Sequence, residues 1–207
     1  MGIQRQNLKK SFQNNDESQS DCELWENFKS GCESAFKSIY FLHYYALYHY
    51  ALNISKDETV SVDAIQDLFS DLWGSRKRLG HVLSIKAYLL SSLRRRVLQK
   101  LKRKRRKQVL ALEFFTFDPD IEFSPEILMI QRENDLFRQA AVREALNELS
   151  KRQKEVVYLR FFLDISYKEV AQVMGINYQS VLNHHQTAIQ KLRNNEALLR
   201  AASRGKL

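Results

Sequence analysis

Glycine and proline are scarce in this chain, and their placement limits the fold more than any other feature of the sequence. The 207 residues include 6 Gly and 2 Pro, too little turn chemistry for a sheet of many strands. Both prolines, Pro119 and Pro125, lie in one short interval in the middle of the chain. We therefore predict an all-α protein built from two small helical domains, with a single linker that contains both prolines.

The charge of the chain is strongly positive and unevenly distributed. Lys and Arg total 33 against 24 Asp and Glu, so the formal net charge is +9, and a polyanion such as nucleic acid is the expected partner. Every charged residue of 94–107 is basic, whereas 113–135 is acidic apart from Arg132. We predict a flexible acidic linker. It either folds back on the basic segment or is solvated independently of it, and we favour the second interpretation.

The sequence favours a reducing, cytoplasmic location. Cys22 and Cys32 match no disulfide framework, zinc site or redox motif, and residues 1–20 contain no apolar stretch of the kind found in a signal peptide. Residues 38–55 carry no formally charged side chain, but their many tyrosines and histidines would need partners that lipid cannot supply. We expect a buried helix there and no stable membrane insertion.

Apolar residues at helical spacing predict the helices of the first domain. The expected core positions of its first part are Leu24, Phe28, Cys32, Phe36 and either Ile39 or Tyr40. A helix over 60–73 places apolar residues on one side and the stripe Asp63, Gln66, Asp67 and Ser70 on another. This stripe is either an ordinary solvated face or a protein-docking surface.

A basic helix is predicted over 84–102, after a loop at 74–83. Its apolar residues recur at a spacing of four, and arginines and lysines fill the other faces. Tyr88, near the start of this helix, either stacks on an unpaired base or belongs to the core.

The second domain contains the spacing of a helix-turn-helix motif. Ser166 can cap a helix with Glu169 at the capping-box position, and Ser150 can cap the preceding helix. Such a motif needs a small residue for close helix contact, a glycine for the left-handed turn and an apolar residue that packs the second helix against the first. Those three positions hold Ala171, Gly175 and Val181.

Polar side chains project from the beginning of the second helix of that motif. Those that could reach bases or phosphates are Tyr178, Gln179, Ser180, Asn183 and His184. His184 and His185 are adjacent, so they point in different directions and predict no shared metal site. We expect His185 to be a neutral, hydrogen-bonded packing residue.

Three motifs in order make the chain resemble a bacterial sigma factor of the extracytoplasmic function (ECF) group, within the sigma-70 family and closest to Bacteroidetes-type members. They are DAIQDLFSDLW at 63–73, KAYLLSSLRRR at 86–96 and LSKRQKEVVYLRFFLDISYKEVAQVMGINYQSV at 149–181. In that family the first domain, σ2, binds the β′ clamp helices of RNA polymerase and reads and melts the minus-10 element. The second domain, σ4, reads the minus-35 element and contacts the β flap.

The resemblance implies three sets of site residues. Core polymerase would be bound by Asp63, Gln66, Asp67 and Ser70. The minus-10 element would be bound and melted by Arg78, His81, Tyr88, Arg94, Arg95 and Gln99, with the loop 78–83 lining a pocket for a flipped base. The minus-35 element would be bound by Ser166, Tyr167, Tyr178, Gln179, Ser180, Asn183 and His184. Arg95 and Gln99 stand where the family commonly has Asn and Asp, which leaves the minus-10 preference open.

The predicted organisation follows from these assignments. It comprises a disordered tail at 1–22, σ2 at 23–107, the linker at 108–134, σ4 at 135–196 and a C-terminal tail at 197–207. The expected partners are core RNA polymerase, promoter DNA and an anti-sigma factor, with no metal or other cofactor.

Three other classes of protein share parts of this sequence pattern or must be excluded by it. A conventional helix-turn-helix regulator is the main alternative. A basic RNA-binding protein would not explain the spacing of Ala171, Gly175 and Val181. An enzyme is not expected, because the sequence contains no phosphate-binding loop, nucleophile motif or metal-ligand cluster.

Overall fold

The computed structural model describes residues 21–108, 136–196 and 198–199, and these residues form helices with no strand. The predicted all-α class is therefore confirmed. The first domain comprises α2 (Asp21–Lys29), α3 (Glu33–Ser55), α4 (Glu58–Ser75), the short 3-10 turn η1 (Arg76–Arg78) and α5 (Ile85–Gln108). The second comprises α7 (Leu136–Asn147), α8 (Lys151–Val157), the π-helical turn η2 (Tyr158–Phe162), α9 (Tyr167–Met174) and α10 (Tyr178–Asn194).

The tails and the linker lie mostly outside the described residues. The predicted acidic linker at 108–134 lies outside the described residues, apart from Gln108 at the end of α5. The N-terminal tail was predicted to reach residue 22, but α2 already begins at Asp21. No helix among the described residues combines the length and apolarity needed to cross a bilayer.

The first two helices are separated by a sharp turn, which corrects one core assignment. Gly31 has a φ of 98° and separates α2 from α3, so the helical spacing from Leu24 to Ile39 is interrupted. Cys32 then precedes the first turn of α3 and is exposed, not buried as expected. Phe28 and Ile39 lie fully in the core, as predicted.

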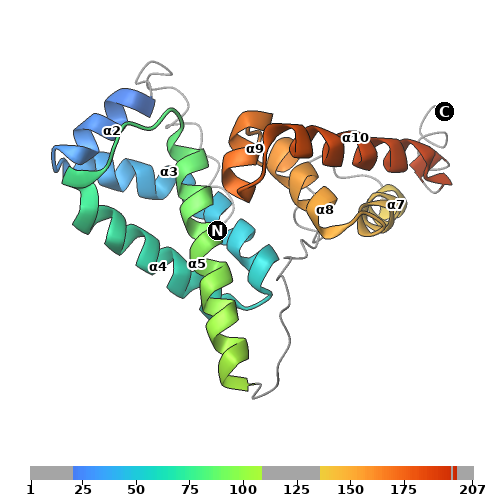
Figure 1. Ribbon diagram of the computed structural model, residues 1–207, viewed down its shortest axis with the longest axis horizontal. Helices are drawn as coiled ribbons and strands as arrows, with labels where there is room; N and C mark the ends of the chain where they lie inside the picture. Colours follow the sequence, from blue (N-terminus) through green and yellow to red (C-terminus); the bar gives the residue numbers. More distant parts are fainter. Residues whose placement is uncertain (1–20, 109–135, 197, 200–207) are drawn as a thin grey trace.

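The first domain is a bundle in which α3, α4 and α5 pack against one another (Figure 1). The predicted apolar faces are confirmed, with Ile65, Phe69 and Leu72 of α4 buried against the other helices. Asp57 caps α4 by accepting a hydrogen bond from Val60 N at 3.1 Å. A cluster of aromatic rings closes the end of the bundle near α2 and includes Trp25, Phe28, Phe36 and Trp73.

The second domain contains the predicted helix-turn-helix. Both helix starts have complete capping boxes, formed by Ser150 with Gln153 and by Ser166 with Glu169. Gly175 ends α9 with a φ of 66°, the left-handed conformation that the spacing required. Val181 is fully buried and seats α10 against the preceding helices.

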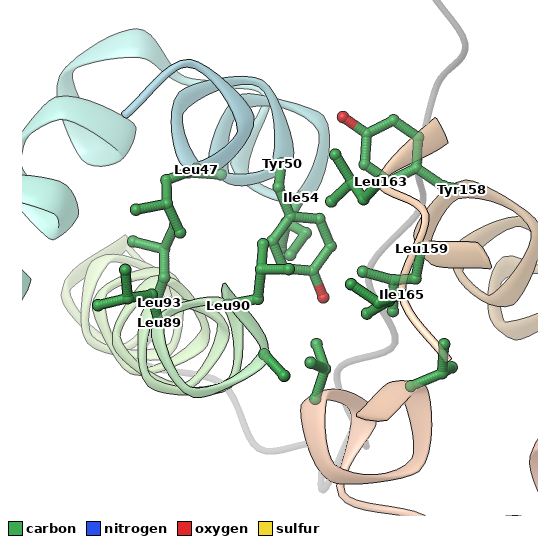
Figure 2. Close-up of a cluster of buried hydrophobic side chains, with 14 of the residues drawn as sticks. Leu47, Tyr50, Ile54, Leu89, Leu90, Leu93, Tyr158, Leu159, Leu163 and Ile165 are labelled. Carbon is green, nitrogen blue, oxygen red and sulfur yellow. The ribbon is translucent and has the colours of Figure 1, made fainter. Parts of the chain in front are cut away.

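The two domains share one continuous hydrophobic core, because α9 packs directly against α5. Figure 2 shows this junction, with Leu90 of α5 and Tyr50 and Ile54 of α3 facing Leu159 and Ile165 of the second domain. The linker therefore joins two lobes that are already in contact. Sequence periodicity did not predict this packing.

Candidate nucleic-acid interface

The acidic stripe of α4 is exposed, as its spacing predicted. Asp63, Gln66, Asp67 and Ser70 all lie on the solvent side of the helix. Asp67 forms an ion pair with Lys100 of α5, with 2.7 Å between Oδ2 and Nζ. One of the two carboxylates of this face is therefore ion-paired with the basic helix α5.

A basic and aromatic corner forms where α2 meets the loop between η1 and α5. The Trp25 indole N–H donates to the Gly80 carbonyl at 2.9 Å, which fixes the loop. Tyr88 lies edge-on to Trp25, with 5.3 Å between the ring centroids, so it is packed as well as accessible. Arg78 at the end of η1 and His81 on the loop are exposed, and the His81 Nε2 lies 3.2 Å from the Cys22 sulfur. The corner offers cations and one aromatic edge to a ligand.

The remaining candidates for minus-10 binding do not share one surface. Arg95 and Gln99 are exposed on α5. Arg94 instead points into the junction between the lobes, where its Nε donates to Glu155 Oε1 at 2.8 Å and its Nη2 to Oε2 at 3.1 Å. Only 17% of the Arg94 side chain is exposed. In this closed arrangement Arg94 is turned away from solvent.

The first two turns of α10 present the polar side chains that the helix-turn-helix spacing predicted. Asn177 caps the helix by accepting from Ser180 N at 2.7 Å. Gln179 and Asn183 are exposed one turn apart and joined by a 3.1 Å amide hydrogen bond, while Tyr178 is 45% exposed. This arrangement presents two adjacent amides at the start of a helix, which suits contacts with base edges and phosphates.

The other predicted members of this surface have additional roles within the protein. The Ser166 hydroxyl accepts from Glu169 N and so caps α9. The Tyr167 hydroxyl lies 3.0 Å from His185 Nε2. His184 is half-buried beside the exposed Asn183.

His185 is the packing histidine that the sequence predicted. Besides its hydrogen bond with Tyr167, its ring stacks near Phe161 at 5.8 Å between centroids. Burial, followed by the charge of Arg160, lowers the pKa of His185, so the neutral form is favoured. These contacts brace α10 against α9 and η2.

No metal centre is present in the part of the chain that the structure describes. Those residues hold no group of three or more His, Cys, Asp or Glu side chains placed to bind a metal ion. Both cysteines are free and exposed.

Comparison with known proteins identifies the two domains. Residues 39–107 match the family model for sigma-70 region 2, and residues 139–192 match that for sigma-70 region 4. The chain belongs to the sigma-70 family, in its ECF group. It is a promoter-directing sigma factor, and a conventional helix-turn-helix regulator is not favoured. Sigma factors bind core RNA polymerase and promoter DNA and are not enzymes.

Individual relatives span most of this sigma factor. It is 24% identical over 151 residues to the RNA polymerase sigma factor SigV of Bacillus subtilis, covering 73% of this chain and 84% of the relative. It is 25% identical over 175 residues to the ECF RNA polymerase sigma factor SigX of the same organism, covering 81% and 87%.

Solved structures show the same fold. CnrH in complex with the cytosolic domain of CnrY superposes with a TM-score of 0.56 at 23% identity, over 87% of this chain and 97% of that one. RpoE in complex with the anti-sigma factor NepR from Bartonella quintana gives 0.57 at 23% identity, over 80% and 96%. Neither comparison bears on the Bacteroidetes-type assignment, which stays a prediction.

Sequence reasoning missed two participants in the geometry of these surfaces. Tyr50 and Glu155 belong to different domains, and both contact Arg94 or its partner at the domain junction. Glu155 directly precedes Val156 and Val157, which are buried in α8, but no sequence pattern identifies its partner.

Proposed function

We propose that α10 reads the minus-35 element through Gln179 and Asn183, with Ser166, Tyr167, Tyr178, Ser180 and His184 around them. The observation that carries this proposal is the exposed amide pair on the first turns of the second helix of the motif. Side-chain amides can bond adenine in the major groove with two hydrogen bonds. The N-terminus of α10 adds a favourable site for a phosphate.

Region 2 supplies the other two surfaces in this proposal. The exposed stripe Asp63, Gln66, Asp67 and Ser70 binds the β′ clamp helices, because an acidic face on a protein of charge +9 complements a basic partner. The minus-10 element is bound and melted by the corner around Tyr88 and by the basic side of α5. The residues assigned to this role are Arg78, His81, Tyr88, Arg94, Arg95 and Gln99.

Regulation by an anti-sigma factor is part of the same proposal. CnrH and RpoE, which share this fold, were solved in complexes with partner proteins, and the partner of RpoE is an anti-sigma factor. Such a partner would cover the polymerase-binding surfaces of regions 2 and 4. We place this sigma factor in the cytoplasm, where it meets core polymerase and promoter DNA.

Run-off transcription tests the minus-35 assignment. Purified core polymerase from the source bacterium is mixed with the chain and fragmented genomic DNA, and the transcription starts are sequenced. The shared upstream motif then supplies a promoter duplex. Replacing Gln179 and Asn183 with Ala should reduce the protein's preference for this promoter duplex over a scrambled duplex by about 1 to 3 kcal/mol per lost base contact. Gln186→Ala with Gln190→Ala, exposed farther along α10, is the matched control. Equal discrimination by both variants would refute the assignment.

A charge reversal tests the polymerase-binding face. Asp63→Lys with Asp67→Lys should weaken binding to core polymerase while leaving the minus-35 duplex affinity unchanged, because α4 and α10 are separate surfaces. Glu144→Lys with Glu148→Lys makes the same charge change at exposed positions of region 4. If both pairs of reversals weaken core binding equally, the effect is one of net charge and the face has no special role.

A further inference from the structure

A fully buried carboxylate lies at the junction between the two domains. Glu155 of α8 is completely shielded from solvent. It accepts a hydrogen bond from the Tyr50 hydroxyl of α3 at 2.6 Å and two from the Arg94 guanidinium of α5 at 2.8 and 3.1 Å. The partners of this region 4 carboxylate therefore both belong to region 2.

Apolar side chains enclose this network. Tyr50 is fully buried and stacks with Tyr158 of η2, with ring centroids 6.1 Å apart and an interplanar angle of 11°. Figure 2 shows the Tyr50 hydroxyl pointing toward the space between α5 and the second domain, near Ile165. The ion pair therefore lies in a medium of low dielectric constant.

Further polar contacts extend the junction along α5. The Lys86 ammonium donates to the Leu163 carbonyl, and the Ser91 hydroxyl donates to the Gln172 carbonyl at 3.4 Å. Both acceptors are backbone groups of region 4. The junction thus runs from the start of α5 to Arg94, with the buried ion pair at its far end.

The buried ion pair stabilises this junction only while both of its partners are present. Removing a carboxylate and a guanidinium from water costs several kcal/mol, and their attraction offsets that cost only while both partners are present. Burial by itself lowers the pKa of Arg94, but the hydrogen bonds and charge of Glu155 outweigh it and raise the net pKa. When the domains separate, water solvates both ions again, so the ion pair itself adds little to the free energy of the closed state, which the shared apolar core stabilises. Removing one partner alone leaves the other charge buried without compensation, and that favours separation of the domains.

The closed junction also decides which surfaces can act. Nε and Nη2 of Arg94 are both occupied by Glu155, and α9 covers the adjoining part of α5. The stripe on α4 and the amide pair on α10 remain exposed in the same arrangement. The arrangement thus keeps one candidate melting residue from solvent and leaves both recruitment surfaces exposed.

We propose that Tyr50, Glu155 and Arg94 form a latch that holds regions 2 and 4 together in the free sigma factor and keeps Arg94 from single-stranded DNA. Opening the latch releases Arg94 for the melted strand. The latch itself rests on the contacts across the junction. Only its effect on DNA rests on the proposed role of Arg94.

Two measurements on the full chain test the latch with Glu155→Gln, which keeps the shape of the side chain and removes its charge. Small-angle X-ray scattering should show a larger radius of gyration than for the wild type. A fluorescein-labelled single strand of random sequence should bind about three- to tenfold more tightly, because a guanidinium becomes available to phosphates. Glu148→Gln is the same change at an exposed position of region 4. It should alter neither the radius of gyration nor the affinity for the labelled single strand.

A double variant separates the latch from the role of Arg94. Arg94→Gln with Glu155→Gln should scatter as an open chain but lose the gain in single-strand affinity. An open Glu155→Gln variant without that gain would overturn the DNA part of the proposal and the role of Arg94, while the latch would stand. If Glu155→Gln and wild type have the same radius of gyration, the latch is overturned.

Loss of folding is excluded by a milder substitution. Circular dichroism of each variant reports the helix content. If Glu155→Gln loses helix, Tyr50→Phe replaces it, because this change removes one hydroxyl from the network and leaves the aromatic ring in place. A folded Tyr50→Phe chain should have a radius of gyration above that of the wild type, and an unchanged radius would overturn the latch.

Discussion

His43 is a buried ionisable group whose titration should control the acid stability of region 2. It lies in α3 with 7% of its surface exposed, and its Nε2 has no hydrogen-bond partner among the described residues. Burial lowers its pKa from the ordinary 6.5 to about 4, while Asp21 of α2 raises it and Lys86 of α5 lowers it further. The folded protein therefore holds His43 neutral well below the pH at which an unfolded chain protonates it.

The sign and size of the effect follow from these two pKa values. Because the folded pKa is the lower one, the unfolded state binds more protons between pH 6.5 and 4, and stability falls as pH falls through that window. The loss approaches about 1.4 kcal/mol per pH unit inside the window. Between pH 8 and pH 4.5 it amounts to about 2.5 kcal/mol from His43 alone, and below pH 4 it levels off at about 3.4 kcal/mol.

Urea unfolding followed by tryptophan fluorescence measures this loss in the right domain. The chain has 2 Trp, and both Trp25 and Trp73 belong to the region 2 core that contains His43. His43→Leu should have a stability near that of the wild type at pH 8 and should lose about 2.5 kcal/mol less on going to pH 4.5. Other groups titrate equally in both chains, so their contributions cancel in the comparison.

A second histidine provides the control. His81 is exposed on the loop before α5, so His81→Leu makes the same chemical change outside the core and serves as the matched control. If His43→Leu and the wild type lose the same stability between pH 8 and pH 4.5, the buried neutral histidine is not the cause and the reasoning fails.

Three further substitutions test how the helices are held, each by urea unfolding. Gly175→Ala places a Cβ on a residue with a φ of 66° and open space around it, so backbone strain alone should cost about 1 kcal/mol; an unchanged midpoint would show that the turn relaxes. Ser166→Ala removes an acceptor for Glu169 N and should cost about 1 kcal/mol, with Ser166→Asp retaining most of the stability; equal losses in the two variants would argue against capping. Phe28→Ala should cost about 3 to 5 kcal/mol, because the ring is fully buried beside Trp25, and a loss below 1 kcal/mol would contradict that packing.

Features that depend on residues close in sequence were predicted well. The helix-turn-helix could be read from Ala171, Gly175 and Val181 because a turn and its two flanking helices lie within a few residues of one another. The exposed stripe on α4 could be read because the period of a helix fixes which residues share a face. In both cases the local sequence contains all the atoms that decide the conformation.

Features that depend on distant residues were not predicted. The spacing that placed Cys32 in the core assumed an unbroken helix, and the turn at Gly31 changed its direction. From the sequence alone, Arg94 cannot be distinguished from the many other basic residues of a solvated helix. Its partner Glu155 is 61 residues away, and Tyr50 is 105 residues from Glu155, so no periodicity connects them.

The position of Arg94 implies an order of events in promoter opening. In the closed chain the stripe on α4 and the amides of α10 are exposed, so each can make its first contact with core polymerase or with the minus-35 duplex before the domains separate. Contact of Arg94 with the melted strand requires Glu155 to leave, and Glu155 moves with region 4. A partner that binds regions 2 and 4 at positions farther apart than the junction allows would open the latch with its own binding free energy. Melting would then follow recruitment because the same displacement of region 4 that accompanies recruitment exposes the cation that melting uses.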